Sequence, residues 1–314
     1  MQYELRYQVI EPQRQTYQNV ADRLGDQPAS RYLEGTLDVE PRENFHYRPT
    51  WAQDRELYDP RYTALRLTDP YDFLDPRQYY YTPYVTNRAS AHDEFGKTIG
   101  YLEKRGLLSR LPQRWHHLVA EVVVPLRHFE SGAQLISVAG ARFAYGTTIE
   151  QCCTYAAFDR IGNAQMLSRL GLAQGSGTAD ILRTAKNAWL EGAHLQPLRR
   201  LVEEVMALDD WAEALLAVDA VDKLVYPLLY AGLDETALLG GAGSYSLVAQ
   251  HFTTWFADQR KWLDALCVAW TSDSEHAANN QAVLDRIDQT WGARAEEAVA
   301  PIAAIVRELE GQAA

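Results

Sequence analysis

The sequence has little cysteine, no long apolar run and no concentration of positive charge. Three cysteines in 314 residues, two of them adjacent (Cys152 and Cys153), cannot form a disulfide framework, which is typical of a cytoplasmic protein. No apolar run reaches the roughly 18 residues of a membrane helix, and no charged segment leads into an apolar one at the start, so we expect neither membrane insertion nor secretion. The net charge of −12 argues against a nucleic-acid partner, because binding to phosphates requires a concentrated basic surface.

Runs of alternating β-branched residues are also absent, and from about Ala89 onward the pattern is helical. Two stripes of buried character recur at steps of three and four residues, one within 113–141 and one from Ile149 to Leu170. Pro125 falls inside the first stripe and should kink that helix. Further helices are predicted at 178–191, 196–207, 209–231, 245–271 and 278–309. These long helices with short joins predict an all-α bundle.

The first part of the chain has a different composition. Eight of the thirteen prolines and twelve of the eighteen tyrosines lie before residue 85. Proline at this density removes backbone donors and disfavours long helices, so we predict an extended Pro/Tyr-rich arm over 1–88, followed by a helical domain over 89–314. An arm with many aromatic rings and no periodic pattern has little means of building its own core, so it should lie on another surface.

Short motifs that could carry chemistry have simpler interpretations. GSGT (175–178) and GGAG (240–243) could cradle a phosphate, but neither follows a strand or carries a P-loop lysine, so we interpret both as turns. Cys152 and Cys153 point to different faces of a helix and are interpreted as buried structural thiols. The Glu-x-x-His spacing of helical diiron sites occurs at Glu43–His46, in the arm, and at Glu191–His194, at a helix join, and we interpret both as coincidence.

Several segments resemble the β subunit of the hydroxylase of bacterial multicomponent phenol hydroxylases, which are soluble diiron monooxygenases. They are RQTYQNVADRLGDQPASRY (14–32), NFHYRPTW (44–51), DPRQYYYTPYV (75–85), KRGLLSRLP (104–112) and VPLRHFESGA (124–133). The resemblance implies a ferritin-like bundle without iron, paired with a diiron α subunit and a small γ subunit in an (αβγ)2 assembly. It also implies a regulatory protein and a reductase with FAD and a 2Fe-2S cluster, for NADH- and O2-dependent conversion of phenol to catechol.

The same resemblance identifies positions where metal ligands have been lost. The α-subunit pattern places one glutamate where this chain has Glu130 and an Asp-Glu-x-Arg-His segment where it has Asp159 to Asn163. The bridging glutamate is therefore replaced by Arg160 and the histidine by Asn163. An arginine is permanently cationic and offers no lone pair, so no metal, catalytic or cofactor-binding residue is expected in this chain.

Because Arg160 and Asn163 interrupt an apolar stripe, their burial would require polar partners. We predict a Glu130–Arg160 contact, with Arg160 reaching solvent as the alternative.

The sequence leaves three functions open: an iron-free structural subunit of an aromatic monooxygenase, a self-sufficient diiron enzyme that would need ligands the sequence lacks, and an unrelated helical adaptor. The first accounts for the resemblance, although it does not separate phenol from toluene or cresol as substrate. In that case aromatic residues of the arm should be buried against the α subunit, or alternatively against this chain's own bundle. The interface candidates are Tyr47, Trp51, Tyr71, Phe73, Tyr79, Tyr80 and Tyr81.

Overall fold

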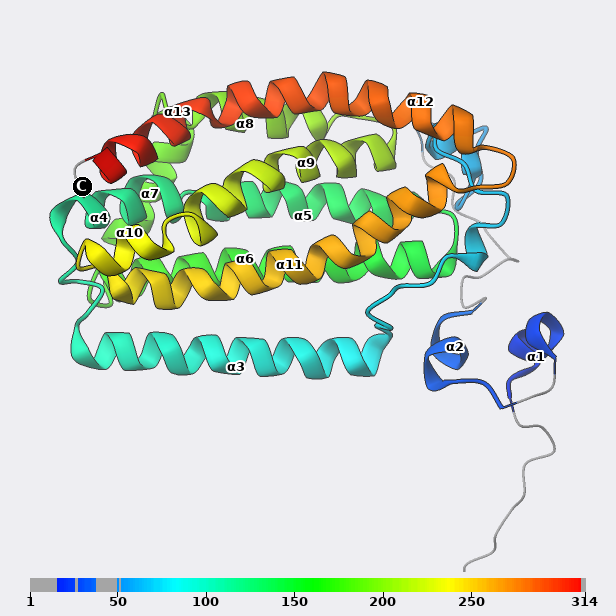
Figure 1. Cartoon of the computed structure of the whole chain (residues 1–314), viewed down its shortest axis with the longest axis horizontal. Helices are drawn as coiled ribbons and strands as arrows, with labels where there is room; N and C mark the ends of the chain where they lie inside the picture. Colours follow the sequence, from blue (N-terminus) through cyan, green and yellow to red (C-terminus); the bar gives the residue numbers. More distant parts are fainter. Residues whose placement is uncertain (1–15, 26–27, 38–49, 51, 312–314) are drawn as a thin grey trace, which may run out of the picture.

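Long helices run side by side in the structure, a computed structural model that describes residues 16–25, 28–37, 50 and 52–311 (Figure 1). All regular structure within these residues is helical, as predicted. The α-helices are α1 (Gln18–Leu24), α2 (Arg31–Thr36), α3 (Tyr81–Arg105), α4 (Gln113–Leu118), α5 (Leu126–Phe143), α6 (Thr147–Gln174), α7 (Asp180–Glu191), α8 (Gln196–Val205), α9 (Trp211–Tyr226), α10 (Asp234–Leu239), α11 (Gly243–Thr271), α12 (Ala277–Ile287) and α13 (Ala293–Gly311). Among the described residues, no helix combines the length and apolar character needed to cross a membrane.

Helices α5, α6, α9 and α11 form the centre of the bundle. Both predicted stripes are confirmed as buried, including Phe129 of α5 and Leu167 of α6, which are fully enclosed. In Figure 1, α12 and α13 lie along one edge of the bundle and α3 lies along the opposite edge. The centre is therefore shielded on both sides, so polar groups there must find partners within the protein.

The first stripe is not one regular helix. A π-helical turn, η3 (Val119–Val123), separates α4 from α5, and the Val124 N–H donates to the Val119 carbonyl at 2.8 Å. It ends two residues before Pro125, which cannot donate a backbone hydrogen bond. The π-turn η4 (Pro227–Ala231) continues α9, and η5 (Asp288–Gly292) joins α12 to α13. These turns allow each predicted helix to continue with an interrupted hydrogen-bond pattern.

The predicted start of the helical region near Ala89 is wrong, because α3 already begins at Tyr81. Pro83 lies in the first turn of α3, where backbone N–H groups have no helical acceptor and a missing donor costs little. The density of proline therefore placed the predicted start of the helical region several residues too far along the chain. At its other end, α3 stops at Gly106, which takes a left-handed conformation with φ 60°.

Residues 52–80 pack against this chain's own bundle. Two single turns, η1 (Pro60–Tyr62) and η2 (Pro70–Asp72), each begin with a proline and are capped by the preceding aspartate. Tyr62, Leu65 and Phe73 belong to the same apolar core as the bundle helices. Asn280 of α12 exchanges two hydrogen bonds with the backbone of Arg66, at 2.9 and 2.7 Å. This part of the arm is therefore integral to the bundle.

The expectation that the α subunit buries these aromatic rings is wrong for Tyr71, Phe73 and Tyr79, because this chain itself encloses them. The alternative, that the arm folds back over its own bundle, is confirmed for residues 52–80. Tyr80 is partly exposed and Tyr81 is 70 % exposed, so contact of these two with a partner stays a prediction. Tyr47 and Trp51 lie outside the described residues.

A close backbone approach joins the arm to the turn between α5 and α6. Gly146 has φ 114°, a conformation that other residues rarely adopt, and a Cβ atom at this position would lie 2.5 Å from the Pro70 carbonyl oxygen. Only glycine satisfies both conditions without strain. At this turn the arm thus packs directly against the backbone of Gly146, in addition to burying its side chains in the bundle.

The junction of α5 and α7 contains a histidine whose protonation should depend on folding. The His128 ring stacks on Trp189 with ring centroids 6.0 Å apart, and its Nε2 accepts a hydrogen bond from Arg127 at 3.3 Å. Burial, with added repulsion from Arg127 and Lys186, lowers the pKa of His128 to about 4. The folded protein therefore keeps this ring neutral at pH values where an unfolded chain protonates it.

We expect His128 to make the protein less stable in mild acid. The unfolded chain takes up this proton below its ordinary pKa of about 6.5, whereas the folded chain resists it down to about 4, so stability is lost as pH falls between these values. Urea unfolding of His128→Gln should show a smaller loss of stability than the wild type from pH 7 to pH 4.5. His117→Gln, at a histidine that is 60 % exposed, controls for removing one histidine. Equal pH profiles for the wild type and His128→Gln would contradict this assignment.

Candidate functional site

Five polar side chains meet at the centre of the bundle, where apolar packing would be expected. They are Glu130 of α5, Arg160 and Asn163 of α6, and Asp222 and Tyr226 of α9, and each is at most 2 % exposed. Residues three or four apart share a helix face, so Arg160 with Asn163 and Asp222 with Tyr226 point the same way. We call this set the central cluster. It lies where three helices of the four-helix centre face one another.

Arg160 is the hub of the central cluster. Its Nη1 donates to Glu130 Oε2 at 3.1 Å and to Asp222 Oδ1 at 3.0 Å, while its Nη2 donates to Asp222 Oδ2. The carboxylate of Asp222 is therefore bound by both terminal nitrogens, which is the strong, two-pronged form of this interaction. The Trp255 ring of α11 lies over the guanidinium, 4.8 Å from ring centroid to Cζ. All four helices of the centre thus contact one cation.

The remaining polar atoms are joined in a short network. Tyr226 Oη donates to Glu130 Oε1 at 2.6 Å and accepts from Asn163 Nδ2 at 3.1 Å. Burial opposes the charge of Arg160, but Asp222 and Glu130 outweigh it and raise the pKa of the guanidinium further. Burial raises the pKa of Asp222 to about 7, with Glu130 adding to the effect and Arg160 opposing it. One permanent cation thus pairs with both carboxyl groups in a region without solvent.

The predicted Glu130–Arg160 contact is present, and the alternative of an arginine reaching solvent is wrong, since Arg160 is 2 % exposed. Sequence reasoning missed Asp222 and Tyr226. Their signal was a carboxylate inside the apolar segment AVDAVDKLVY (217–226), where a buried charge implies a buried partner. The spacing of a metal motif could not have revealed them, because the pairing crosses from α6 to α9.

The residues of the central cluster do not fit a metal site. The guanidinium of Arg160 already lies between the two carboxylates, and it repels metal ions and offers them no lone pair. Asn163 is an amide whose nitrogen already donates to Tyr226. Within the described part of the chain, no group of three His, Cys, Asp or Glu side chains is arranged to hold a metal ion.

The other candidate motifs lie apart from the central cluster. Glu191 ends α7, and His194 Nε2 donates to the Glu121 carbonyl at 2.8 Å. The Glu43–His46 pair lies outside the described residues. Cys152 and Cys153 are buried, and burial raises the pKa of both thiols. The segments around Gly175 and Gly241 form turns before α7 and α11.

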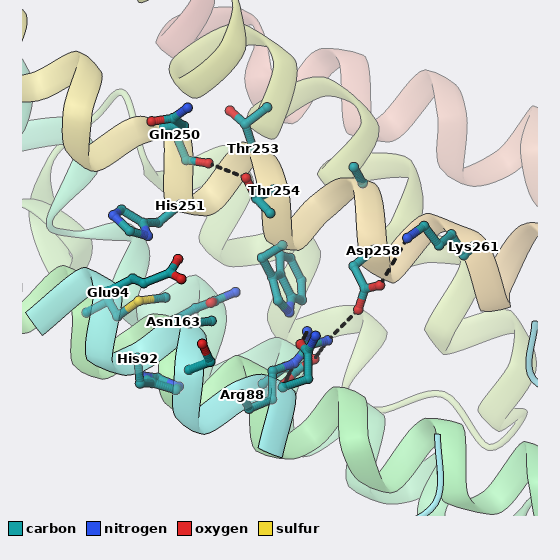
Figure 2. Close-up of a pocket in the computed structure, with 17 residues that line it drawn as sticks. Arg88, His92, Glu94, Asn163, Gln250, His251, Thr253, Thr254, Asp258 and Lys261 are labelled. Atoms are coloured by element: carbon teal, nitrogen blue, oxygen red, sulfur yellow. Dashed lines mark hydrogen bonds and ion pairs between the residues drawn. The ribbon is translucent and has the colours of Figure 1, made fainter. Parts of the chain in front are cut away.

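Asp159, the acidic residue next to Arg160, faces a different partner. Arg88 of α3 binds its carboxylate through Nε and Nη2, at 2.8 and 2.7 Å, and also binds Asp258 of α11 at 2.7 Å (Figure 2). Tyr84 Oη donates to Asp159 as well, at 2.8 Å. This arrangement ties α3 to α6 and α11 by charge. Asp159 is therefore no remnant ligand at the centre, because its carboxylate points toward α3.

A cavity of about 790 Å³ lies between α3, α6 and α11 (Figure 2). Arg88, His92 and Glu94 contribute to its wall from α3, and His251, Asp258 and Lys261 from α11. Its wall also includes Asn163, which belongs to the central cluster, and Trp255, whose ring lies over Arg160. The cavity therefore reaches to within one side chain of Arg160.

Comparison with known proteins covers almost the entire chain. The sequence model of the Methane/Phenol/Alkene Hydroxylase family matches residues 51–274. The oxygenase component DmpL of phenol 2-monooxygenase from Pseudomonas sp. (strain CF600) is 39 % identical over 304 residues, which span 96 % of this chain and 91 % of that protein. The oxygenase component MhpL of phenol 2-monooxygenase from Acinetobacter pittii (strain PHEA-2) is 37 % identical, over 88 % of this chain and 83 % of the relative.

A solved structure supports the same grouping. A chain of the xenon-pressurized phenol hydroxylase from Pseudomonas sp. OX1 superposes with a TM-score of 0.89 at 35 % identity, and the match covers 99 % of this chain and 94 % of that one. Agreement over this length confirms the predicted ferritin-like bundle.

Proposed function

Because this chain belongs to the Methane/Phenol/Alkene Hydroxylase family, we propose that it is the iron-free structural β subunit in the hydroxylase of a multicomponent phenol monooxygenase. In this proposal the chain supports an α subunit that holds the diiron centre, within an (αβγ)2 assembly. A reductase with FAD and a 2Fe-2S cluster and a regulatory protein complete the system. The reaction of the assembly is the NADH- and O2-dependent hydroxylation of phenol to catechol.

The position of Arg160 carries this proposal. The guanidinium of Arg160 lies between Glu130 and Asp222 and forms ion pairs with both. It therefore occupies the position that a metal ion would need. The chain therefore contributes architecture, and the chemistry belongs to a partner. Membership in the family contradicts an unrelated helical adaptor, and the central cluster argues against a self-sufficient diiron enzyme.

The contact surface for the α subunit is also a proposal. Tyr81 is 70 % exposed at the start of α3, and Phe158 of α6 is 54 % exposed, so both rings are available to a partner. Phe158 lies near Tyr84 of α3, with ring centroids 6.4 Å apart. The exposed rings of Tyr81 and Phe158 therefore come from two helices, α3 and α6, that lie side by side. Contact of the remaining arm residues with the α subunit and the cytoplasmic location both stay predictions.

The proposal predicts that the isolated chain binds no stoichiometric iron and hydroxylates nothing. Elemental analysis and a catechol assay on the purified chain test this, with the co-expressed α and γ subunits as the comparison. Iron and NADH-dependent catechol formation should appear only in preparations that contain the α subunit, and activity should fall at least about ten-fold when this chain is omitted. That loss corresponds to about 1.4 kcal/mol in transition-state stabilisation.

Two results would contradict the proposal. Two irons per isolated chain would assign the metal centre to this subunit. Full activity of α and γ subunits without this chain would remove its structural role. A substrate other than phenol, such as toluene, would change the name of the reaction but neither of these outcomes.

A further inference from the structure

We propose that Glu130 and Asp222, with the rings of Trp255 and Phe129, form a binding site for a planar guanidinium cation, which the native chain fills with its own Arg160. The inference concerns the centre of this chain and does not depend on the proposed function. It treats Arg160 as a ligand attached to the protein by its side-chain stem. The site should therefore accept a free guanidinium compound when that ligand is removed.

The contacts match the shape of a guanidinium group. Asp222 accepts from both terminal nitrogens of Arg160, and Glu130 accepts a third hydrogen bond at 3.1 Å from the side. Glu130 is fixed in place by Tyr226, whose hydroxyl donates to its other oxygen at 2.6 Å. Glu130 is thus held in position before the cation arrives, which reduces the cost of binding.

The aromatic wall also favours a planar cation. Trp255 lies 4.8 Å and Phe129 5.7 Å from Arg160 Cζ, measured to the ring centroids. Guanidinium is weakly hydrated and stacks on rings, whereas an ammonium is a compact, strongly hydrated charge. A divalent metal would prefer further carboxylate or imidazole ligands, and within the described residues no such third ligand is placed to help.

The stem of Arg160 adds little to this binding. Its Nε is buried, and no hydrogen-bond acceptor among the described residues reaches it. Truncating the side chain therefore removes only those polar contacts that a free guanidinium can restore. The cavity between α3 and α11 supplies the route, because Asn163 and Trp255 belong both to its wall and to the surroundings of Arg160.

Thermal unfolding of the full-length Arg160→Ala variant, in the form in which it purifies, tests the proposal. Methylguanidinium chloride at millimolar concentration should raise its Tm by about 2 °C once the ligand exceeds its Kd ten-fold. The wild type should not respond, because its site is filled. Arg160→Ala combined with Asp222→Asn is the matched control and should lose the response.

Three outcomes would overturn the proposal: no rise in Tm, an equal rise in the control, or a rise with MnCl2 but not with methylguanidinium. If Arg160→Ala does not fold, the Tm of Arg160→Lys tests the proposal instead. An ammonium cannot donate the parallel pair of hydrogen bonds to Asp222, so this variant should unfold at least about 4 °C below the wild type. Equal Tm values for Arg160→Lys and wild type would also overturn the proposal.

Discussion

Replacing Arg160 with methionine is expected to lower the free energy of unfolding by about 3–5 kcal/mol, the usual cost of leaving a buried charge without its partner. Glu130 and Asp222 would remain in the centre of the bundle, each at most 2 % exposed and without the cation that pairs with both of them. Methionine is close to arginine's stem in length and adds no polar group, so packing is largely kept. Urea unfolding at pH 7.5 measures the change.

A combined replacement distinguishes two quantities. One is the destabilisation caused by a buried charge without a partner, and the other is the net contribution of the central cluster to the free energy of unfolding. Glu130→Gln, Arg160→Met and Asp222→Leu together remove all three charges and leave Tyr226 an amide oxygen to donate to. We expect this triple variant to lie within about 1–2 kcal/mol of the wild type, since buried ion pairs roughly offset their own desolvation. A triple variant as unstable as Arg160→Met alone would show that the ion pairs stabilise the fold directly.

Glu130 and Asp222 should not contribute equally. Asp222 is bound by two nitrogens of Arg160 and Glu130 by one, so a double-mutant cycle should give the larger coupling energy for Arg160 with Asp222. Glu130 also accepts a hydrogen bond from Tyr226, and this bond partly stabilises its carboxylate when Arg160 is removed. The reverse order of coupling energies would show that the network through Tyr226 dominates.

Gly146→Ala is expected to destabilise the chain by about 2–4 kcal/mol, the sum of an unfavourable backbone conformation and a steric clash. The new Cβ would meet the Pro70 carbonyl oxygen at 2.5 Å, so the arm or the turn between α5 and α6 must move. Detachment of the arm should follow, seen as faster amide exchange in residues 60–75. Chemical denaturation and hydrogen exchange measure the two effects.

Gly177→Ala is the matched control for this change. Gly177 has φ 87°, but an added Cβ there meets no atom within 4 Å, so the variant carries the backbone strain without the clash. It should cost about 1 kcal/mol and leave exchange in the arm unchanged. Equal effects of the two variants would mean that the contact with Pro70 contributes nothing.

The bundle was predictable because burial leaves a periodic trace in sequence. Apolar residues at helical spacing indicate α5 and α6 directly, and Arg160 and Asn163 stand out because they break that spacing. The arm leaves no such trace. Residues such as Phe73 are buried by helices distant in the chain, and an irregular segment does not record which surface covers it.

The central cluster was predictable on α5 and α6 only in part. Glu130 and Arg160 could be paired because the family resemblance places both at ligand positions of the α-subunit pattern, on consecutive helices. Asp222 required knowing that α9 packs beside them, which spacing within one helix cannot show. The start of α3 was misplaced for a local reason, since proline is unfavourable inside a helix but harmless at Pro83, in its first turn.

The central guanidinium is covalently attached to α6 through the Arg160 side chain, so its positive charge, unlike that of a bound ion, cannot dissociate from the protein. A metal ion must be captured from the cell, can be lost to a chelator, and leaves its carboxylates repelling one another until it arrives. The cation of Arg160 is part of the chain itself, so every molecule carries one such cation with its two carboxyl groups. The positive charge at the centre of this bundle is thus present as soon as the chain is made, whatever the supply of metal at that moment.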